Sequence, residues 1–211
     1  MTSMPRTDIT RLDEYAVTDR AVLDALLDTA RVAHVGLVDK GWPVVIPTAV
    51  ARHGDAVIVH GSTGSRWLRA LAAGAPACIT VTAIDGLVLA RSAFESSMHY
   101  RSAVLFGTCT PLEGAAKSRA LDVLTDSLVP GRVPEVRRPT KRELAATLLL
   151  TMPIARWSLK VSDGWPEDPE SDVAGPAWAG VVPMTTTYGQ PQPAPDLAAG
   201  IDVPPSVLAL R

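Results

Sequence analysis

Short polar turns between apolar runs constrain the fold of this chain more than any other feature of its sequence. Asp39-Lys40-Gly41 and His53-Gly54-Asp55 each separate two runs rich in β-branched residues, and Asp85-Gly86 divides another pair. Connections of two or three residues join antiparallel neighbours, because a parallel crossover needs a dozen residues or more. Seven segments are predicted as strands on this pattern: 32–38, 43–52, 56–60, 77–84, 87–94, 100–112 and 152–161.

Helical periodicity occurs between some of these strands. Thr18 is predicted to cap a helix whose apolar stripe ends at Ala30, and a short second helix follows Arg66. Leucines at helical spacing predict a third helix over 115–128, and the capping box from Thr140 to Glu143 opens a fourth. Helices inserted between hairpin-paired strands predict an α+β protein built on an antiparallel barrel.

Composition divides the chain into three parts: a polar arm over 1–17, a folded domain over 18–162 and a Pro-rich tail over 163–211. The tail holds nine of the 18 prolines. Residues 1–162 carry 19 Lys and Arg against 15 Asp and Glu, whereas the tail carries one Arg against seven acids. A net charge of +4 on the body suits an anionic ligand, and the tail is acidic. We expect the apolar run 178–182 to pin the tail, which packs on the barrel or on a dimer partner.

Charge and hydropathy disfavour several classes of protein. The formal net charge of -2 gives no basis for nucleic-acid or membrane-surface binding. No apolar run approaches the roughly 18 residues of a membrane span, and the N-terminus lacks the apolar core of a signal peptide. Cys78 and Cys109 lie in strand-like runs, which is typical of buried, reduced thiols. We therefore expect a cytoplasmic protein, and the histidine spacing predicts no metal site.

The stretch from His60 to Arg66, His-Gly-Ser-Thr-Gly-Ser-Arg, leaves a predicted strand and enters a predicted helix. Glycine-freed amides, hydroxyl donors and a guanidinium at a helix start are the components of a phosphate site. An ordinary capped turn has the same composition. His60 is the candidate for proton transfer, although a histidine at a strand end is also a common structural residue.

Five motifs, taken in order, resemble the pyridoxamine 5'-phosphate oxidase-like flavin-binding split-barrel superfamily. The branch they resemble is that of small flavin-nucleotide-binding proteins, which includes nitroimidazole-resistance reductases. The motifs are Val45-Ile46-Pro47-Thr48, the stretch from His60 to Arg66, Tyr100-Arg101-Ser102 ahead of Phe106-Gly107, Ser158-Leu159-Lys160-Val161, and the run from Trp178 to Pro183.

The resemblance implies a homodimer of six-stranded, Greek-key antiparallel split barrels with FMN in a groove at the subunit interface. The loop ending in Arg66 would hold the phosphate, the strand from Ile46 to Thr48 would line the isoalloxazine, and Tyr100 to Ser102 would approach the flavin. The cofactor-binding residues it implies are Ile46, Pro47, Thr48, His60, Gly61, Ser62, Gly64, Ser65, Arg66, Trp67, Tyr100, Arg101, Ser102 and Lys160.

Trp67 departs from the family pattern, because many relatives carry a lysine there. Losing a charge-assisted phosphate contact costs about 1.5–3 kcal/mol. Deazaflavin or haem therefore stays open as an alternative to FMN.

These features predict an FMN-dependent oxidoreductase that acts on a small organic substrate. Flavin carries the hydride or electron chemistry, so no strong acid or base is required of the protein. A non-catalytic flavin-binding or regulatory module is the alternative from another class. Oxidation of pyridoxamine phosphate itself is disfavoured, because Arg137-Arg138 lies in an expected loop and no clear second phosphate cluster is present.

Overall fold

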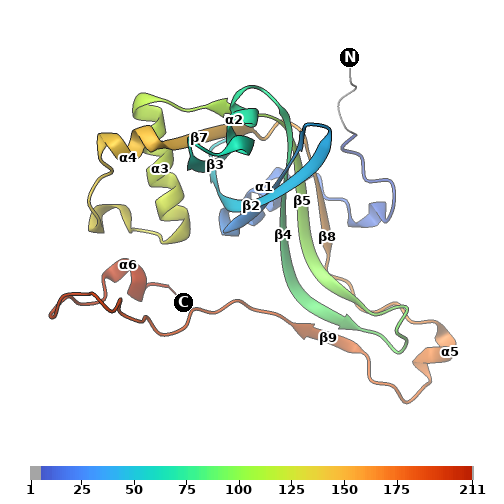
Figure 1. Cartoon of the computed structure of the whole chain (residues 1–211). Coiled ribbons are helices and arrows are strands. Elements are labelled where there is room, and N and C mark those ends of the chain that lie inside the picture. The colour runs from blue at the N-terminus through green and yellow to red at the C-terminus, as the bar shows by residue number, and fades with distance from the viewer. Residues whose placement is uncertain (1–5, 211) are drawn as a thin grey trace.

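A curled antiparallel sheet forms the centre of the molecule in the computed structural model, which describes residues 6–210 (Figure 1). The strands follow the order β6-β7-β3-β2-β1-β4-β5-β8, and β9 pairs with β4. Their bounds are β1 Val32–Asp39, β2 Trp42–His53, β3 Ala56–Ser62, β4 Pro76–Leu89, β5 Ser97–Thr108, β6 Thr110–Pro111, β7 Thr147–Pro153, β8 Trp157–Ser162 and β9 Gly180–Pro183. The α+β split-barrel prediction is confirmed, with nine strands among the described residues instead of six.

Helices pack on both faces of this sheet. Their bounds are η1 Asp13–Tyr15, α1 Arg20–Thr29, α2 Arg66–Ala72, α3 Gly114–Leu128, η2 Val133–Glu135, α4 Lys141–Ala146, α5 Glu170–Val173 and α6 Pro205–Leu208. The predicted capping box of α4 is confirmed. The cap of α1 is Asp19 instead of Thr18, because the Asp19 carboxylate accepts the Ala21 N–H at 2.8 Å.

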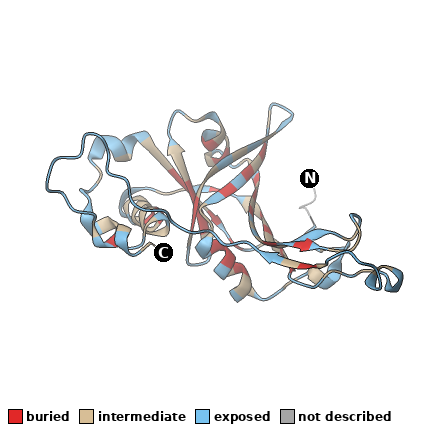
Figure 2. Ribbon diagram, turned by 90° about the horizontal axis from the view of Figure 1, so that it is seen from below, coloured by how far each residue is buried: buried red, intermediate tan, exposed pale blue. Residues whose placement is uncertain are grey.

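The core has two parts on opposite faces of the curled sheet. Leu23, Leu26 and Leu27 of α1 are fully buried in the larger part, inside the curl, as expected of an amphipathic helix. Figure 2 shows the buried residues concentrated on the strands of the curl and on helices beside them. Ala120 and Leu124 of α3 pack on the other face of β2, β3 and β7. Within residues 6–210, no helix is both long and apolar enough to cross a bilayer.

The hairpin predicted at Asp85-Gly86 is wrong. β4 continues through both residues with a bulge between Ile84 and Gly86, and the chain turns at residues 90–96 instead. A Cβ on Gly86 would lie 3.0 Å from the Val182 carbonyl oxygen, so glycine is needed for the close approach of β9. The Asp-Gly pair therefore serves a bulge with a tail strand beside it, and the predicted strand over 87–94 ends at Leu89.

The strand predicted over 152–161 is two strands that lie near opposite ends of the strand order. β7 pairs with β3 and β8 pairs with β5. The connector between them is held by the Ile154 N–H, which donates to the Asp55 carbonyl at 2.8 Å, and by the Arg156 carbonyl, which accepts the Phe106 N–H at 2.9 Å. This short connector brings the two ends of the curled sheet together. The strand predicted over 100–112 likewise begins earlier, at Ser97, and is interrupted at Cys109.

The two terminal segments both reach the sheet. Ala16 forms an isolated bridge with Lys160, and residues 1–5 of the predicted arm lie outside the described residues. β9 pairs with the part of β4 from Gly86 to Leu89, so the run from Trp178 to Val182 does pin the tail. Trp178 itself is exposed, because it is the backbone of this run that makes the contact.

Candidate functional site

On β1, β4 and β5, the face opposite the larger core is not covered by any described helix, and we call it the open face. Val35, Ile79 and Leu105 form a buried row across β1, β4 and β5. The next row faces the open side of the sheet, because successive strand residues alternate between faces. It consists of Gly36, Cys78 and Phe106. None of these three residues is fully buried.

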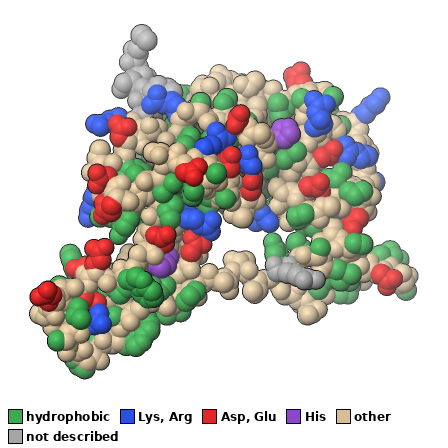
Figure 3. All heavy atoms as spheres, turned by 180° about the vertical axis from the view of Figure 1, so that it is seen from behind, with side chains coloured by type: hydrophobic (Ala, Val, Ile, Leu, Met, Phe, Trp, Pro, Cys, Tyr) green, Lys and Arg blue, Asp and Glu red, His purple; other side chains and the backbone are tan. Residues whose placement is uncertain are grey.

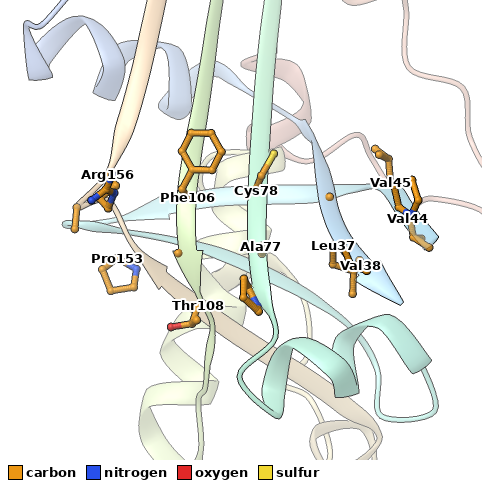
Figure 4. A pocket seen from close by; sticks show the side chains of 15 residues that line it. Leu37, Val38, Val44, Val45, Ala77, Cys78, Phe106, Thr108, Pro153 and Arg156 are labelled. Atoms are coloured by element: carbon orange, nitrogen blue, oxygen red, sulfur yellow. The ribbon is translucent and has the colours of Figure 1, made fainter. Parts of the chain in front are cut away.

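A cavity of about 650 Å³ lies at the end of the open face that carries Gly36, Cys78 and Phe106 (Figure 4). This volume is in the range of sites for cofactors and drug-sized ligands. The cavity is lined by Gly36, Leu37, Val38, Pro43, Val44, Val45, Pro76, Ala77, Cys78, Phe106, Gly107, Thr108, Pro153, Ala155 and Arg156. Among these described residues, Arg156 alone brings a formal charge to the wall.

The two ends of the curled sheet meet at this cavity, which is why both supply its walls. Arg156 belongs to the β7–β8 connector and is tied to β5 through its carbonyl and the Phe106 amide. Gly107 permits this closure, since a Cβ there would lie 3.0 Å from Cγ of Met152. In Figure 4, the Phe106 and Cys78 side chains lie on the same side of their strands, and Arg156 lies beyond Phe106.

The predicted phosphate loop folds partly onto itself. The Gly64 N–H donates to Ser62 Oγ at 3.1 Å, and the Ser65 N–H donates to the Ser62 carbonyl at 2.9 Å. The Thr63 N–H donates to the Ala146 carbonyl at 2.9 Å. These three amides already have acceptors, so a phosphate at this loop would depend mainly on side chains.

Arg66 begins α2 as predicted, and its guanidinium pairs with Asp39, with Nη2 2.9 Å from Oδ2. The Arg66 side chain is 71% exposed. Asp39 directly follows the cavity residue Val38 in β1. The ion pair therefore places the end of the predicted loop beside the rim of the cavity.

The predicted β2 residues divide between the two faces. Ile46 and Thr48 pair with the buried Val35 and Ala33, so they face the interior. Pro47 pairs with His34 on the open face. In this part of β2 the described pairing is with β1 alone, since pairing with β3 begins at Val50. Pro47 therefore lies on an unpaired edge of this part of β2, where a proline removes no ladder hydrogen bond.

The predicted cations of β5 and β8 already have protein partners. Arg101 makes two hydrogen bonds of 2.8 Å to the Asp85 carboxylate, which lower the pKa of Asp85. Lys160 Nζ donates to the Arg11 carbonyl at 2.6 Å. Tyr100 precedes Arg101 on β5, and Ser102 Oγ lies 3.2 Å from Thr82 Oγ1. None of these residues lines the cavity itself.

His60 lies apart from the cavity. It pairs with Leu149, which belongs to the core under α3. Its Nδ1 is buried without a hydrogen-bond partner among the described residues, and burial lowers the pKa of the imidazole. A neutral ring is therefore favoured at this position.

Gly61 and Trp67 have packing roles in the same region. A Cβ on Gly61 would come within 2.8 Å of Leu68 Cδ1, so any larger residue there would require the buried Leu68 side chain to shift. Trp67 packs against the larger core, which accounts for an apolar residue in place of lysine.

One signal in the sequence pointed to the cavity wall. Phe106-Gly107 contributed to the resemblance, yet neither residue was among the predicted cofactor contacts. Arg156 carried no signal, because a single arginine inside a predicted strand indicates nothing by itself. Within the described part of the chain, no group of three or more His, Cys, Asp or Glu residues could hold a metal ion.

The curled sheet defines a split-barrel protein with a cavity on the open face. The chain belongs to the pyridoxamine 5'-phosphate oxidase family, whose model matches residues 19–161. No curated protein matches the chain.

Two solved structures resemble the chain over almost its whole length. An FAD and haem binding protein from Mycobacterium smegmatis is 55% identical, with a TM-score of 0.90, over 93% of this chain and 97% of that one. The flavocytochrome Anf3 from Azotobacter vinelandii is 36% identical, with a TM-score of 0.91, over 97% of this chain and 96% of that one. A candidate 5-nitroimidazole antibiotic resistance protein from Bacteroides thetaiotaomicron shares the fold at 20% identity and a TM-score of 0.59, over 69% of this chain and 86% of that one.

Proposed function

We propose that this protein is a flavin-dependent redox protein that holds its flavin in the cavity of the open face. The observation that carries the proposal is the composition of the cavity wall, which is mostly apolar and carries one charged residue, Arg156, and one hydroxyl, that of Thr108. A flavin nucleotide has a matching division into a flat, largely apolar ring and an anionic tail. Membership of the family and the FAD named for the 55% identical relative support the assignment.

The chain's own residues divide between binding the ring and binding the phosphate. Phe106, Val38 and Val45 supply apolar surface for the ring and exclude water from it. Arg156 in the wall and Arg66 at the rim are the cations that would bind the anionic tail. Arg66 would have to exchange its Asp39 partner for the ligand.

FAD is favoured over the FMN that the sequence resemblance implies. The Mycobacterium smegmatis relative is described as binding FAD, and it shares more than half of its residues with this chain. Both flavins carry the same ring and a phosphate next to the ribityl chain, so the same cavity serves either. They differ in the adenylate part, which needs additional surface beyond the cavity.

A bound flavin supplies hydride or electron transfer to a small organic substrate. The protein's contribution is to bind and orient it in an apolar environment. His60 is not part of this wall, so we assign it no proton transfer at the flavin. The chemistry proposed for the cavity therefore requires no acid or base among the lining residues.

Haem is a second candidate cofactor, because one relative is described as an FAD and haem binding protein and the other as a flavocytochrome. Iron in haem proteins is commonly held by a neutral histidine. His60 fits this requirement, with an unpartnered ring nitrogen and a lowered pKa. His34 on the open face is the competing ligand, whereas His99 Nε2 already contacts the Gly164 carbonyl at 2.8 Å.

The functional unit in this proposal is a homodimer with the cofactor near the subunit interface. Large apolar side chains around the open face are exposed, including Trp42 at 74% and Val38 at 65%. Exposed apolar patches of this kind are typical of interaction surfaces.

The test is an absorbance spectrum of the purified full-length protein before and after denaturation. We expect flavin absorbance that is released on denaturation, bleaching with a nicotinamide donor or dithionite, and recovery with an electron acceptor. A haem band that persists in His34→Ala and is lost in His60→Ala would assign the iron ligand. Protein that binds neither FMN nor FAD would refute the proposal, and flavin that never turns over would favour the non-catalytic module.

A further inference from the structure

The C-terminal tail forms a loop that is fixed at both ends and stands away from the body of its own chain. All 22 residues from 182 to 203 are exposed. Figure 3 shows the tail crossing open space between the two ends of the molecule. We call residues 184–204 the strap.

The first end of the strap is fixed by the sheet. β9 pairs with the part of β4 from Gly86 to Leu89. The Met184 N–H then donates to the Asp85 carbonyl at 2.9 Å. Asp85 is in turn held by Arg101, so this anchor belongs to the ordered sheet.

The second end is fixed by a hydrogen-bonded pair, which we call the latch. The buried Ser206 of α6 donates its N–H to Glu135 Oε1 at 3.0 Å and its hydroxyl to Glu135 Oε2. Both hydrogen bonds favour the ionised carboxylate and lower the pKa of Glu135. The tail thus returns to the body after leaving it for about 20 residues.

The strap exposes apolar side chains that its own chain covers only in part. Met184, Tyr188, Leu197, Ile201 and Val203 are between 42% and 57% exposed. Pro191 and Pro193 favour an extended backbone. The chain then turns at residues 194–197, where the Leu197 N–H donates to the Ala194 carbonyl at 3.0 Å. Because both ends are held, these side chains can be buried only by another molecule.

We propose that the occupant is a second copy of this chain, and that each strap clasps the β1–β2 hairpin of its partner. The hairpin turn carries the exposed Val38, Lys40 and Trp42. Asp196 and Asp202 of the strap carry the charge opposite to that of Lys40 in the hairpin turn. The two parts of the chain are also opposite in net charge, with -6 on residues 163–211 and +4 on residues 1–162. In a two-fold dimer the same contact occurs twice, so each copy gives one strap and receives one.

This inference rests on the proposed homodimer but not on the cofactor. Its test places a benzophenone amino acid at Tyr188 or at Ile201 of the full chain, which is mixed with a differently tagged copy and irradiated. The matched control carries the same group at Ala115, an exposed residue of α3. Light scattering of the same samples measures the oligomeric state.

We expect a dimer whose strap positions crosslink to residues 38–45 of the other copy, with at least tenfold higher yield than Ala115. Ser206→Ala should lower this yield several-fold by weakening the latch, and Trp42→Ala should weaken the dimer about tenfold. A dimer that crosslinks only within one chain, or elsewhere on the partner, would overturn the clasp and leave the dimer standing. A monomer would overturn both.

Discussion

The Arg66 guanidinium lies 2.9 Å from the Asp39 carboxylate, so the principal cation of the predicted phosphate loop is neutralised when no anion is bound. Arg66 begins α2 and Asp39 ends β1, and the two meet beside the cavity of the open face. A flavin phosphate that uses Arg66 must therefore compete with a carboxylate for the same guanidinium. An exposed pair of this kind is worth about 0.2–1 kcal/mol, which makes the exchange inexpensive.

Removing the competitor should strengthen binding of phosphorylated flavins. Asp39→Asn should tighten FMN and FAD by up to about fivefold, because it releases Arg66 at the cost of one exposed ion pair. Riboflavin, which lacks a phosphate, is the control and should be unaffected. Fluorescence titration of the flavin-free protein measures all three, and equal changes for riboflavin and FMN would contradict a phosphate contact at Arg66.

Arg66→Gln and Arg156→Gln together identify the residue that binds the anionic tail. The variant of the contacting arginine should lose about tenfold or more in FMN affinity while riboflavin affinity stays the same, because one charge-assisted hydrogen bond contributes about 1.5–3 kcal/mol. Arg156 lies in the cavity wall, so we expect the larger loss there. If both variants bind FMN as tightly as the unmodified protein, the phosphate lies elsewhere.

Cys78 should report directly on occupancy of the cavity. Its thiol lines the wall, whereas Cys109 is buried and desolvation raises its pKa to about 11. Iodoacetamide should therefore label Cys78 in the flavin-free protein, and saturating flavin should slow that labelling at least fivefold. Peptide mapping by mass spectrometry measures both sites, with Cys109 as the unreactive internal control. Undiminished labelling of Cys78 in the flavin-bound protein would place the flavin outside the cavity.

His60 should make the fold sensitive to mild acid. Burial lowers its pKa in the folded state below the value of about 6.5 expected in the unfolded chain. The unfolded state then binds more protons near and below pH 6.5, so the free energy of unfolding falls as the pH drops through this range. His60→Gln removes this proton uptake, so its stability should fall less between pH 7 and pH 5 in urea titrations. Parallel pH profiles for the two proteins would show that His60 does not titrate this way.

Local signals in the sequence predicted where turns and helix starts occur. Pairing between segments far apart in the chain determined how the strands are arranged. The α4 capping box and the turns at Gly41 and Gly54 involve residues within one turn of the chain, and these were predicted correctly. Asp85-Gly86 was misread as a hairpin because its actual neighbour, β9, comes almost 100 residues later. No local pattern could show that Val182 would approach Gly86.

The site could be predicted only in part for the same reason. The motif from His60 to Arg66 identified Arg66, which lies at the rim of the cavity and is close in sequence to the other loop residues. The cavity itself forms where β5 meets the β7–β8 connector, and its wall combines Gly36, Phe106 and Arg156. These residues come from three separate segments whose meeting depends on closure of the whole sheet.

The most direct test of a flavin in the open-face cavity is a paired titration of the unmodified protein and Gly36→Val with FAD and FMN. A Cβ at Gly36 would meet only ordinary contacts, 3.7 Å from Cys78 atoms, so the strand should tolerate valine while the added side chain occupies the cavity. We predict a loss of at least 30-fold in flavin affinity with a thermal midpoint within a few degrees of the unmodified protein. Unchanged affinity in a folded Gly36→Val variant would show that the flavin binds elsewhere.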